Sequence, residues 1–389
     1  MLWETTDPSK LAAIVAVTRR ATALRPDIAG NWEALARLLL RTDQDDEAIA
    51  VLTEAVSNLP ADPKLQLMLV DACRRAGRLE LVQEALSRTP SPAVDDREFT
   101  ALRLSLRSPT PQDAIRSATD ALALDPTNPE AIAFLGGVAR RSRHPESMVG
   151  VCQTALQRDP SHTLARYELA LALSMLGRAD DARQLIDLDR FVSVIDAPTP
   201  RAYGNATTFE SELVAEINSN PTLRSDPAGK ATKGGLQSGA LPRAGDHAIV
   251  ALLEQIRAAV DGYAADLTGE IGHPFAERRP GRARLRAWAV VVRGQGRQVA
   301  HIHPDGWLSG VYYVSVPRRD GRNPRGGCLV LGSLDGKGLG IDPPWGTLDI
   351  QPARGRLVLF PSYIPHATLP TESSDARICV SFDVIPVSA

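Results

Sequence analysis

Proline recurs along the first half of this chain at a nearly constant step, and this period constrains the fold more than any other feature. The steps are 34, 32, 34 and 34 residues. Between the prolines the apolar residues keep a helical spacing, as in Leu35, Leu38 and Leu39. A unit repeated at this interval buries its apolar face only against its neighbours, so the pattern predicts an α-helical solenoid. The prolines are Pro26, Pro60, Pro92, Pro126 and Pro160.

Other residues recur in register with the prolines. Ala21 corresponds to Ala55, and Ala121 corresponds to Ala155. Small residues let paired helices approach closely, and a proline ends the second helix of each unit. On this evidence residues 1–190 resemble the tetratricopeptide repeat, with a degenerate unit near 93–125. The family's packing positions are occupied by Trp32, Leu35, Ala36, Leu39, Ala48, Leu52, Ala55 and Pro60, and again by Tyr167, Leu169, Ala170, Gly177 and Ala182.

This resemblance implies a superhelical domain with a concave face. Such faces usually hold a peptide or a partner helix, so we expect the repeats to bind a peptide or protein. The alternative is that they mediate self-association or act as a rigid spacer. The sequence leaves the oligomeric state open.

The character of the chain changes after the repeats. Residues 191–245 are rich in Pro, Gly, Ser and Thr, which predicts a linker and irregular segments. Residues 247–267 then form one amphipathic pattern, typical of a helix. From about 283 the apolar period becomes 2, and several short segments, rich in β-branched residues and bounded by Gly and Pro, predict a jelly roll or small barrel. We therefore expect a β-domain over 246–389, or from near 200, after the helical domain of 1–190.

Two of the seven histidines of the chain lie in one short segment. His301 and His303 are two residues apart, so on a strand both point to the same side. A third, His366, follows another predicted strand. Together they predict a metal site with open positions, and imidazole suits both iron and zinc. Because Pro-Asp-Gly favours a turn, Asp305 offers a second arrangement in which His303, Asp305 and His366 are the ligands.

The C-terminal domain resembles the iron(II)- and 2-oxoglutarate-dependent oxygenases, closest to a bacterial and phage group. The resemblance is close over 280–386 and implies a double-stranded β-helix. It also implies iron(II) as the metal, with 2-oxoglutarate and O2 as cosubstrates. The motifs that carry it are His301-Ile302-His303-Pro304, Ser309-Gly310-Val311-Tyr312-Tyr313, Phe360-Pro361-Ser362 before His366, and Arg377.

The resemblance also implies roles for individual residues. Arg377 lies where the family pairs an arginine with the distal carboxylate of 2-oxoglutarate, and a planar guanidinium suits that ligand. Ser381, on the same side of the strand, and Tyr313 rather than Tyr312 are expected to bind the same cosubstrate. His303 stands where most members have an Asp or Glu ligand, so the set of three ligands stays open.

We expect a hydroxylase that acts on a peptide or protein side chain recruited by the repeats. The alternatives are an oxygenase acting on a small or carrier-bound molecule, and a scaffold with a degenerate oxygenase fold. Trp288 and Trp307 either line the pocket or pack in the core.

Composition limits the remaining classes. The net charge is −2, with 44 basic and 46 acidic residues, which gives no electrostatic sign of nucleic-acid or membrane binding. The four cysteines form no Cys-x-x-Cys pair and are expected to be reduced thiols. Because the sequence shows no secretory signal and no long apolar span, we expect a cytoplasmic protein.

Overall fold

The computed structural model divides the chain into two compact units, residues 6–131 and residues 132–389, with residues 1–5 joining the second unit. The division falls inside the helical region, and most of the degenerate repeat near 93–125 lies outside the described residues. The domain limits expected from the sequence, 1–190 and 246–389, stay a prediction. The structure describes residues 1–4, 8–42, 44–76, 78, 80–81, 111–227, 230–269, 272–318, 323–334 and 342–387.

Successive helices pack against one another in the first unit. Trp32, Leu39 and Leu52 are buried in their shared core, and Ala48 and Ala55 are fully buried beside them. These are the positions that the repeat pattern assigns to packing, so the tetratricopeptide architecture is confirmed here. The described helices are α1 (Pro8–Leu24), α2 (Ala29–Arg41), α3 (Asp45–Asn58), α4 (Pro63–Arg75) and α7 (Pro111–Leu124).

After three of the recurring prolines, Pro60, Pro126 and Pro160, a side chain two residues later caps the next helix. After Pro60, the Asp62 carboxylate accepts the backbone N–H of Leu65 at 3.0 Å, at the start of α4. After Pro126, the Asn128 side chain accepts the N–H three residues further on at 2.8 Å. Each cap satisfies an N–H that the first helical turn leaves without an acceptor. The 34-residue period therefore marks both the end of one helix and the start of the next.

The repeat helices continue into the second unit. Ten of the 13 residues of α10 are buried. Thr163 at its start donates to the Gly306 carbonyl at 2.8 Å, and the Arg166 guanidinium lies 5.2 Å from the centre of the Tyr363 ring. The last repeat helices thus belong to the same compact unit as the strands. They are α8 (Pro129–Ser142), which begins at the boundary, α9 (Glu146–Arg158), α10 (Thr163–Met175), α11 (Ala179–Leu185) and α12 (Leu188–Phe191).

The stretch over 191–245, for which the sequence predicts a linker and irregular segments, also holds regular elements. Its strands are short and polar, so they lack the apolar alternation that reveals a strand in a sequence. In one of them Gly235 approaches strand β5 (Arg282–Gln298) so closely that an added Cβ would lie 2.7 Å from the Val292 side chain. The elements are β2 (Ser193–Asp196), α13 (Ala206–Asn218), β3 (Arg224–Ser225) and β4 (Thr232–Gln237).

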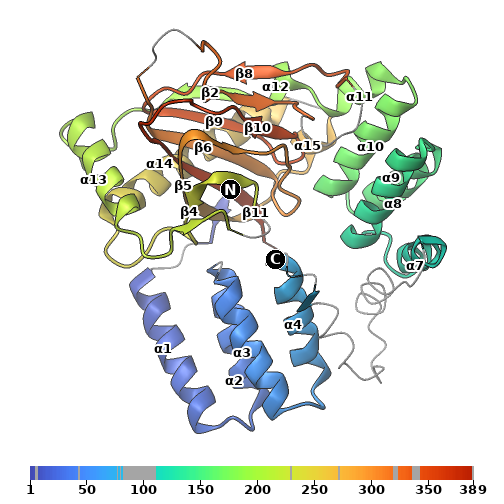
Figure 1. Ribbon diagram of the computed structural model, residues 1–389, viewed down its shortest axis with the longest axis horizontal. Helices are drawn as coiled ribbons and strands as arrows, with labels where there is room; N and C mark the ends of the chain where they lie inside the picture. Colours follow the sequence, from blue (N-terminus) through green and yellow to red (C-terminus); the bar gives the residue numbers. More distant parts are fainter. Residues whose placement is uncertain are drawn as a thin grey trace. The chain divides into compact units, whose positions relative to one another are not determined.

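Two antiparallel sheets form the jelly roll of the second unit (Figure 1). The large sheet has the order β2-β9-β6-β11-β5-β4-β3, with β1 pairing parallel to β5; the small sheet has the order β10-β7-β8. The short segments of period 2 that the sequence predicts from about 283 onward include β5, β6, β7, β9 and β11. The strands are β1 (Leu2–Trp3), β5 (Arg282–Gln298), β6 (Leu308–Ser315), β7 (Leu329–Leu331), β8 (Leu348–Ile350), β9 (Arg356–Pro361), β10 (His366–Thr368) and β11 (Arg377–Pro386).

One long helix accompanies the sheets. α14 (His247–Asp266) matches the helix predicted over 247–267, and the short η1 (Leu267–Gly269) and α15 (Pro274–Glu277) follow it. Among the described helices, none combines the length and the apolar character that a bilayer crossing requires.

Candidate metal centre

Backbone hydrogen bonds bring His301 and His366 together across 65 residues of chain. The two residues form an isolated antiparallel bridge, in which each N–H donates to the other's carbonyl at 3.0 Å. His303 is held beside them because its N–H donates to the Ser362 carbonyl at 3.0 Å. The main chain therefore fixes all three histidines at one end of the jelly roll.

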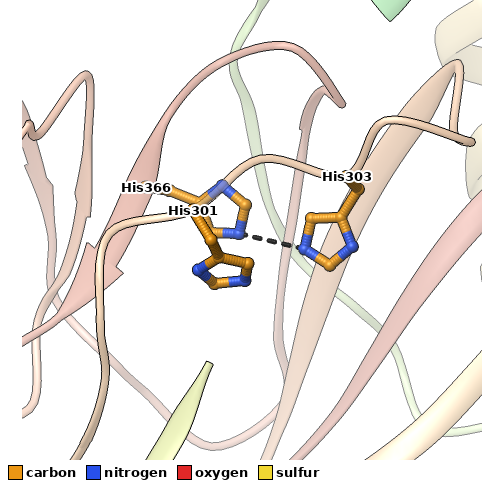
Figure 2. Close-up of side chains that lie close together, drawn as sticks. All are labelled: His301, His303 and His366. Carbon is orange, nitrogen blue, oxygen red and sulfur yellow. Dashed lines mark hydrogen bonds between the residues drawn. The ribbon is translucent and has the colours of Figure 1, made fainter. Parts of the chain in front are cut away.

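The three imidazole rings converge (Figure 2). One nitrogen from each of His301, His303 and His366 lies within 4.8 Å of the other two. The rings of His303 and His366 are nearly parallel, 7° apart, with their Nε2 atoms 3.2 Å from each other. This cluster corresponds to one of the two arrangements that the sequence leaves open, the one with His301 in place of Asp305.

The partners of the Nδ1 atoms indicate which nitrogen of each ring carries the proton. His301 Nδ1 donates to the Val299 carbonyl at 2.7 Å, and His366 Nδ1 donates to the Ile364 carbonyl at 3.0 Å. His303 Nδ1 lies 3.0 Å from a carboxylate oxygen of Asp383. Because a carboxylate oxygen only accepts, Nδ1 of His303 carries the proton as well. With the proton on Nδ1, Nε2 of each ring carries a lone pair, and the Nε2 atoms of His303 and His366 lie 3.2 Å apart. Lone pairs gathered in this way repel one another without a cation, so the donor set fits a divalent metal.

Burial keeps His366 neutral. The pKa of its ring lies well below its ordinary value, first because burial disfavours the charged form and second because His301 and His303 are close. A neutral imidazole is the form that binds a metal.

Asp383 is a buried carboxylate behind His303. Its side chain is fully buried, and besides His303 it accepts hydrogen bonds from Arg286 Nη2 at 2.9 Å and Ser309 Oγ at 2.8 Å. Burial alone would raise the pKa of Asp383, but the His303 ring and the Arg286 guanidinium lower it below its ordinary value. Asp383 is therefore ionised. Asp383 belongs to none of the motifs on which the predicted site rests.

The alternative ligand Asp305 lies apart from this cluster. Its side chain is 58% exposed, and one of its oxygens lies 3.7 Å from Arg286 Nη1. The cluster of potential metal ligands found in the described part of the chain consists of His301, His303 and His366.

A cavity of about 410 Å³, counted with its solvent-open mouth, extends from the three histidines. Tyr313, Arg377 and Ser381, which the sequence predicts as binding residues, all line it. Trp288 lines it as well, with its ring stacked 5.7 Å from that of His303. The other tryptophan, Trp307, packs in the core against Phe275 with ring centres 5.1 Å apart.

Arg377 brings a buried positive charge to the cavity. Its side chain is 1% exposed, and its two Nη groups donate to the Gly327 carbonyl at 2.7 Å and to Thr368 Oγ1 at 3.0 Å. These bonds fix the plane of the guanidinium, while Nε has no hydrogen-bond partner among the described residues. A buried guanidinium with a donor to spare is suited to an anionic ligand.

Two further donors in the cavity wall lack an acceptor. Tyr313 Oη and Trp288 Nε1 are buried and make no hydrogen bond to the described residues. Burial raises the pKa of Tyr313, so its phenol keeps the proton that it would donate. Because unpaired buried donors are costly, the cavity wall favours a ligand rich in acceptor oxygens, such as a dicarboxylate.

Three family models match the chain. Residues 286–383 match a model described as "Putative 2OG-Fe(II) oxygenase", and residues 39–106 and 151–184 match two tetratricopeptide-repeat models. Among curated proteins, none matches the chain.

Three solved structures resemble parts of the chain at low identity and low TM-score. A prolyl-4-hydroxylase from Pseudomonas putida is 19% identical, covers 52% of this chain and 97% of its own, and has a TM-score of 0.35. YrrB, a tetratricopeptide-repeat protein with an unusual peptide-binding site, is 13% identical over 44% of this chain and 93% of its own, with a TM-score of 0.34. A prolyl hydroxylase in complex with a hypoxia inducible factor peptide fragment, from Trichoplax adhaerens, is 13% identical. It covers 54% of this chain and 91% of its own, with a TM-score of 0.34.

The chain therefore joins tetratricopeptide repeats to a 2-oxoglutarate- and iron(II)-dependent oxygenase domain, and it is a dioxygenase. Iron(II), 2-oxoglutarate and O2 are the cofactor and cosubstrates that this domain implies.

Proposed function

We propose that this dioxygenase hydroxylates a side chain of a peptide or protein that its tetratricopeptide repeats recruit. The proposal of an oxygenase reaction rests on one observation: a cluster of histidines and a buried arginine line the same cavity. One nitrogen from each of three histidines lies at one end, and the buried Arg377 with its unpartnered Nε lies in the wall. A metal and a carboxylate ligand satisfy both features together.

In this proposal His301, His303 and His366 hold iron(II), and Arg377 holds the distal carboxylate of 2-oxoglutarate. Together the bound metal and cosubstrate would supply the oxidising chemistry, in which 2-oxoglutarate, O2 and a substrate C–H group give succinate, CO2 and the hydroxylated substrate. Tyr313 Oη and Ser381 Oγ donate to the same carboxylate. The Gly327 and Thr368 bonds keep the guanidinium plane in place while the ligand enters.

The remaining cavity residues shape the reaction space. Trp288 stacks against His303 and closes one side of the metal position, which limits the access of water. Its free Nε1–H is available to an acceptor on the substrate or on the cosubstrate. These residues bind and orient, and they take no part in bond breaking.

The ligand set is tested by metal stoichiometry. His303→Ala and His366→Ala should bind less than one equivalent of Co(II), a non-oxidising stand-in for iron(II), whereas Asp305→Asn should bind as the wild type does. Loss of Co(II) binding in Asp305→Asn, with retention in His301→Ala, would favour the arrangement that contains Asp305.

The peptide substrate is tested by incorporation of isotopically heavy O2. The iron-loaded protein is incubated with 2-oxoglutarate and a mixture of cellular peptides and proteins, and His366→Ala serves as the matched control. The proposal predicts heavy oxygen in a side chain of at least one polypeptide, in the wild-type reaction only. Heavy oxygen confined to small molecules would contradict it.

One observation favours a second candidate, an oxygenase acting on a small molecule. Helix α10 is buried against the oxygenase part, so the last repeat helices serve the fold of the catalytic unit. In that case the repeats would be structural, and the heavy oxygen of the same experiment would appear in a metabolite.

A further inference from the structure

We propose that Asp383 is a positioning residue for the metal centre. Its carboxylate holds the His303 ring with Nε2 toward the metal, and it places a negative charge next to His303 in a set of otherwise neutral ligands. This inference rests on the ligand set proposed above. It assigns to Asp383 part of the role that a metal-binding carboxylate has in a site built from two histidines and one carboxylate.

The contacts of His303 differ from those of the other two histidines. His301 and His366 each donate from Nδ1 to a carbonyl two residues earlier in the chain, so their rings are oriented locally. His303 instead reaches Asp383, 80 residues further on, with Nδ1 3.1 Å from Oδ2 and 3.0 Å from Oδ1. The hydrogen bond that orients this ring at Nδ1 is therefore made to a distant side chain.

Asp383 is fixed more firmly than the histidine that it contacts. It lies in β11, directly opposite Arg286 of β5 and Ser309 of β6. Both neighbours donate to it, at 2.9 and 2.8 Å. His303, in contrast, lies outside the strands, in the segment between β5 and β6. A rigid strand thus supplies the acceptor, and the irregular segment supplies the ligand.

The charges of the site support the same role. Three neutral imidazoles leave the charge of a divalent cation uncompensated, and Asp383 is the fully buried carboxylate in contact with one of them. Burial of a carboxylate costs several kcal/mol unless donors surround it. Here Arg286, Ser309 and His303 fill its acceptor sites. A hydrogen bond from imidazole to a carboxylate makes the other ring nitrogen a stronger ligand.

The test compares Asp383→Asn with Asp305→Asn in the full chain. Asp383→Asn removes the charge and keeps the shape, and Asp305 is a matched control because it contacts the same Arg286 without contacting a histidine. The first readout is the affinity for Co(II) in the absence of 2-oxoglutarate. We expect Asp383→Asn to bind Co(II) about 10–100-fold more weakly, and Asp305→Asn to bind it within about 2-fold of the wild type.

The second readout uses the wild type and does not depend on how a variant folds. Nitrogen-15 NMR of the histidine rings in the metal-free protein reports which nitrogen carries the proton. The proposal predicts that His303 carries it on Nδ1, with that signal shifted by the Asp383 bond. A His303 ring protonated on Nε2 alone would overturn it, as would unchanged Co(II) affinity in Asp383→Asn.

These outcomes are separate from failure of the proposed function. If the wild type binds no Co(II) and no iron(II), the ligand set itself is wrong. If the wild type binds both metals and Asp383→Asn binds them equally well, the oxygenase assignment stands and the role of Asp383 is refuted. Ser309→Ala keeps the charge and the His303 contact, so it should weaken binding by no more than about 3-fold.

Discussion

Thr163, the first residue of repeat helix α10, donates a buried hydrogen bond of 2.8 Å to the carbonyl of Gly306. Gly306 closes the turn that begins at His303, because its own N–H donates to the His303 carbonyl at 3.1 Å. A helix of the repeat region is therefore connected through two hydrogen bonds to the backbone of a proposed metal ligand. The last repeat helices and the proposed metal site therefore belong to the same compact unit.

Thr163→Val should lower both stability and metal affinity. The substitution keeps the volume but leaves the buried Gly306 carbonyl without its donor, which costs about 1–2 kcal/mol. Urea denaturation measures the loss, and a Co(II) titration should show an affinity a few-fold weaker. Thr154→Val is the control, because Thr154 bonds only to Gly150 of its own helix and is exposed. Equal stability and affinity in both variants would show that the contact is inconsequential.

Arg377→Met should abolish binding of 2-oxoglutarate at ordinary concentrations while metal binding persists. The loss of a buried charge partner costs about 2–5 kcal/mol, which corresponds to a weakening of 30-fold or more. Arg377→Lys keeps the charge and loses the planar donor pair, so its affinity should lie between those of the wild type and Arg377→Met. Calorimetry on the Co(II)-loaded protein gives the affinities. Unchanged affinity in Arg377→Met would remove Arg377 from the site.

Tyr313→Phe and Tyr312→Phe form a matched pair on adjacent residues. Tyr313 lines the cavity with an unpartnered hydroxyl, so its removal should weaken 2-oxoglutarate binding by about 5–10-fold and leave stability unchanged or slightly higher. Tyr312, on the other side of β6, should have no effect on that binding. A larger effect of Tyr312→Phe on the KM for 2-oxoglutarate would reverse the assignment.

His273 should make stability depend on acidity. Burial first, and the Arg166 charge second, lower the pKa of His273 to about 4. Below about pH 6.5 His273 is protonated in the unfolded chain but stays neutral in the folded chain. The free energy of unfolding therefore falls as the pH drops from 6.5 toward 4. The loss is on the order of 2 kcal/mol by pH 4.

His273→Gln should flatten that part of the pH dependence. The His273 ring donates from Nε2 to the Gln184 carbonyl at 3.0 Å and accepts the Phe275 N–H at Nδ1, contacts that need the neutral form. The exposed His144→Gln is the control. Denaturation midpoints between pH 4 and 8 that fall in parallel for the wild type and His273→Gln would contradict the assignment.

The sequence predicts the proposed ligand cluster because its signals are local. His301 and His303 lie two residues apart in a pattern of period 2, and His366 follows a strand whose apolar residues are unmistakable. The same alternation places Arg377 and Ser381 on one side of β11, and both line the cavity. Local periodicity gives the side of the strand on which these residues lie, whereas the roles expected of Arg377 and Ser381 come from the resemblance to the oxygenases.

Asp383 shows what local periodicity leaves out. It continues the same alternation, two residues beyond Ser381, and a carboxylate in the apolar run of β11 is a signal that was available. Its meaning depends on pairing with Arg286 and Ser309 and on contact with His303, 80 residues away. Only the tertiary register decides whether such a carboxylate faces solvent or a metal site.

The packing of α10 is missed for a related reason. The repeat pattern explains the burial of α10 against neighbouring helices. The sequence of the helix does not reveal whether only that face is buried or whether its other faces are buried as well. Arg166, buried over Tyr363, is an example, because a long polar side chain in a repeat usually indicates an exposed position.

The most direct test of the account is succinate formation from 2-oxoglutarate in the iron(II)-loaded protein after admission of air, with His366→Ala beside the wild type. The account predicts succinate from the wild type and a loss of at least about 100-fold in His366→Ala, since the removal of a metal ligand removes the bound oxidant. Failure of the wild type to bind either iron(II) or 2-oxoglutarate, or equal succinate formation in His366→Ala, would contradict it.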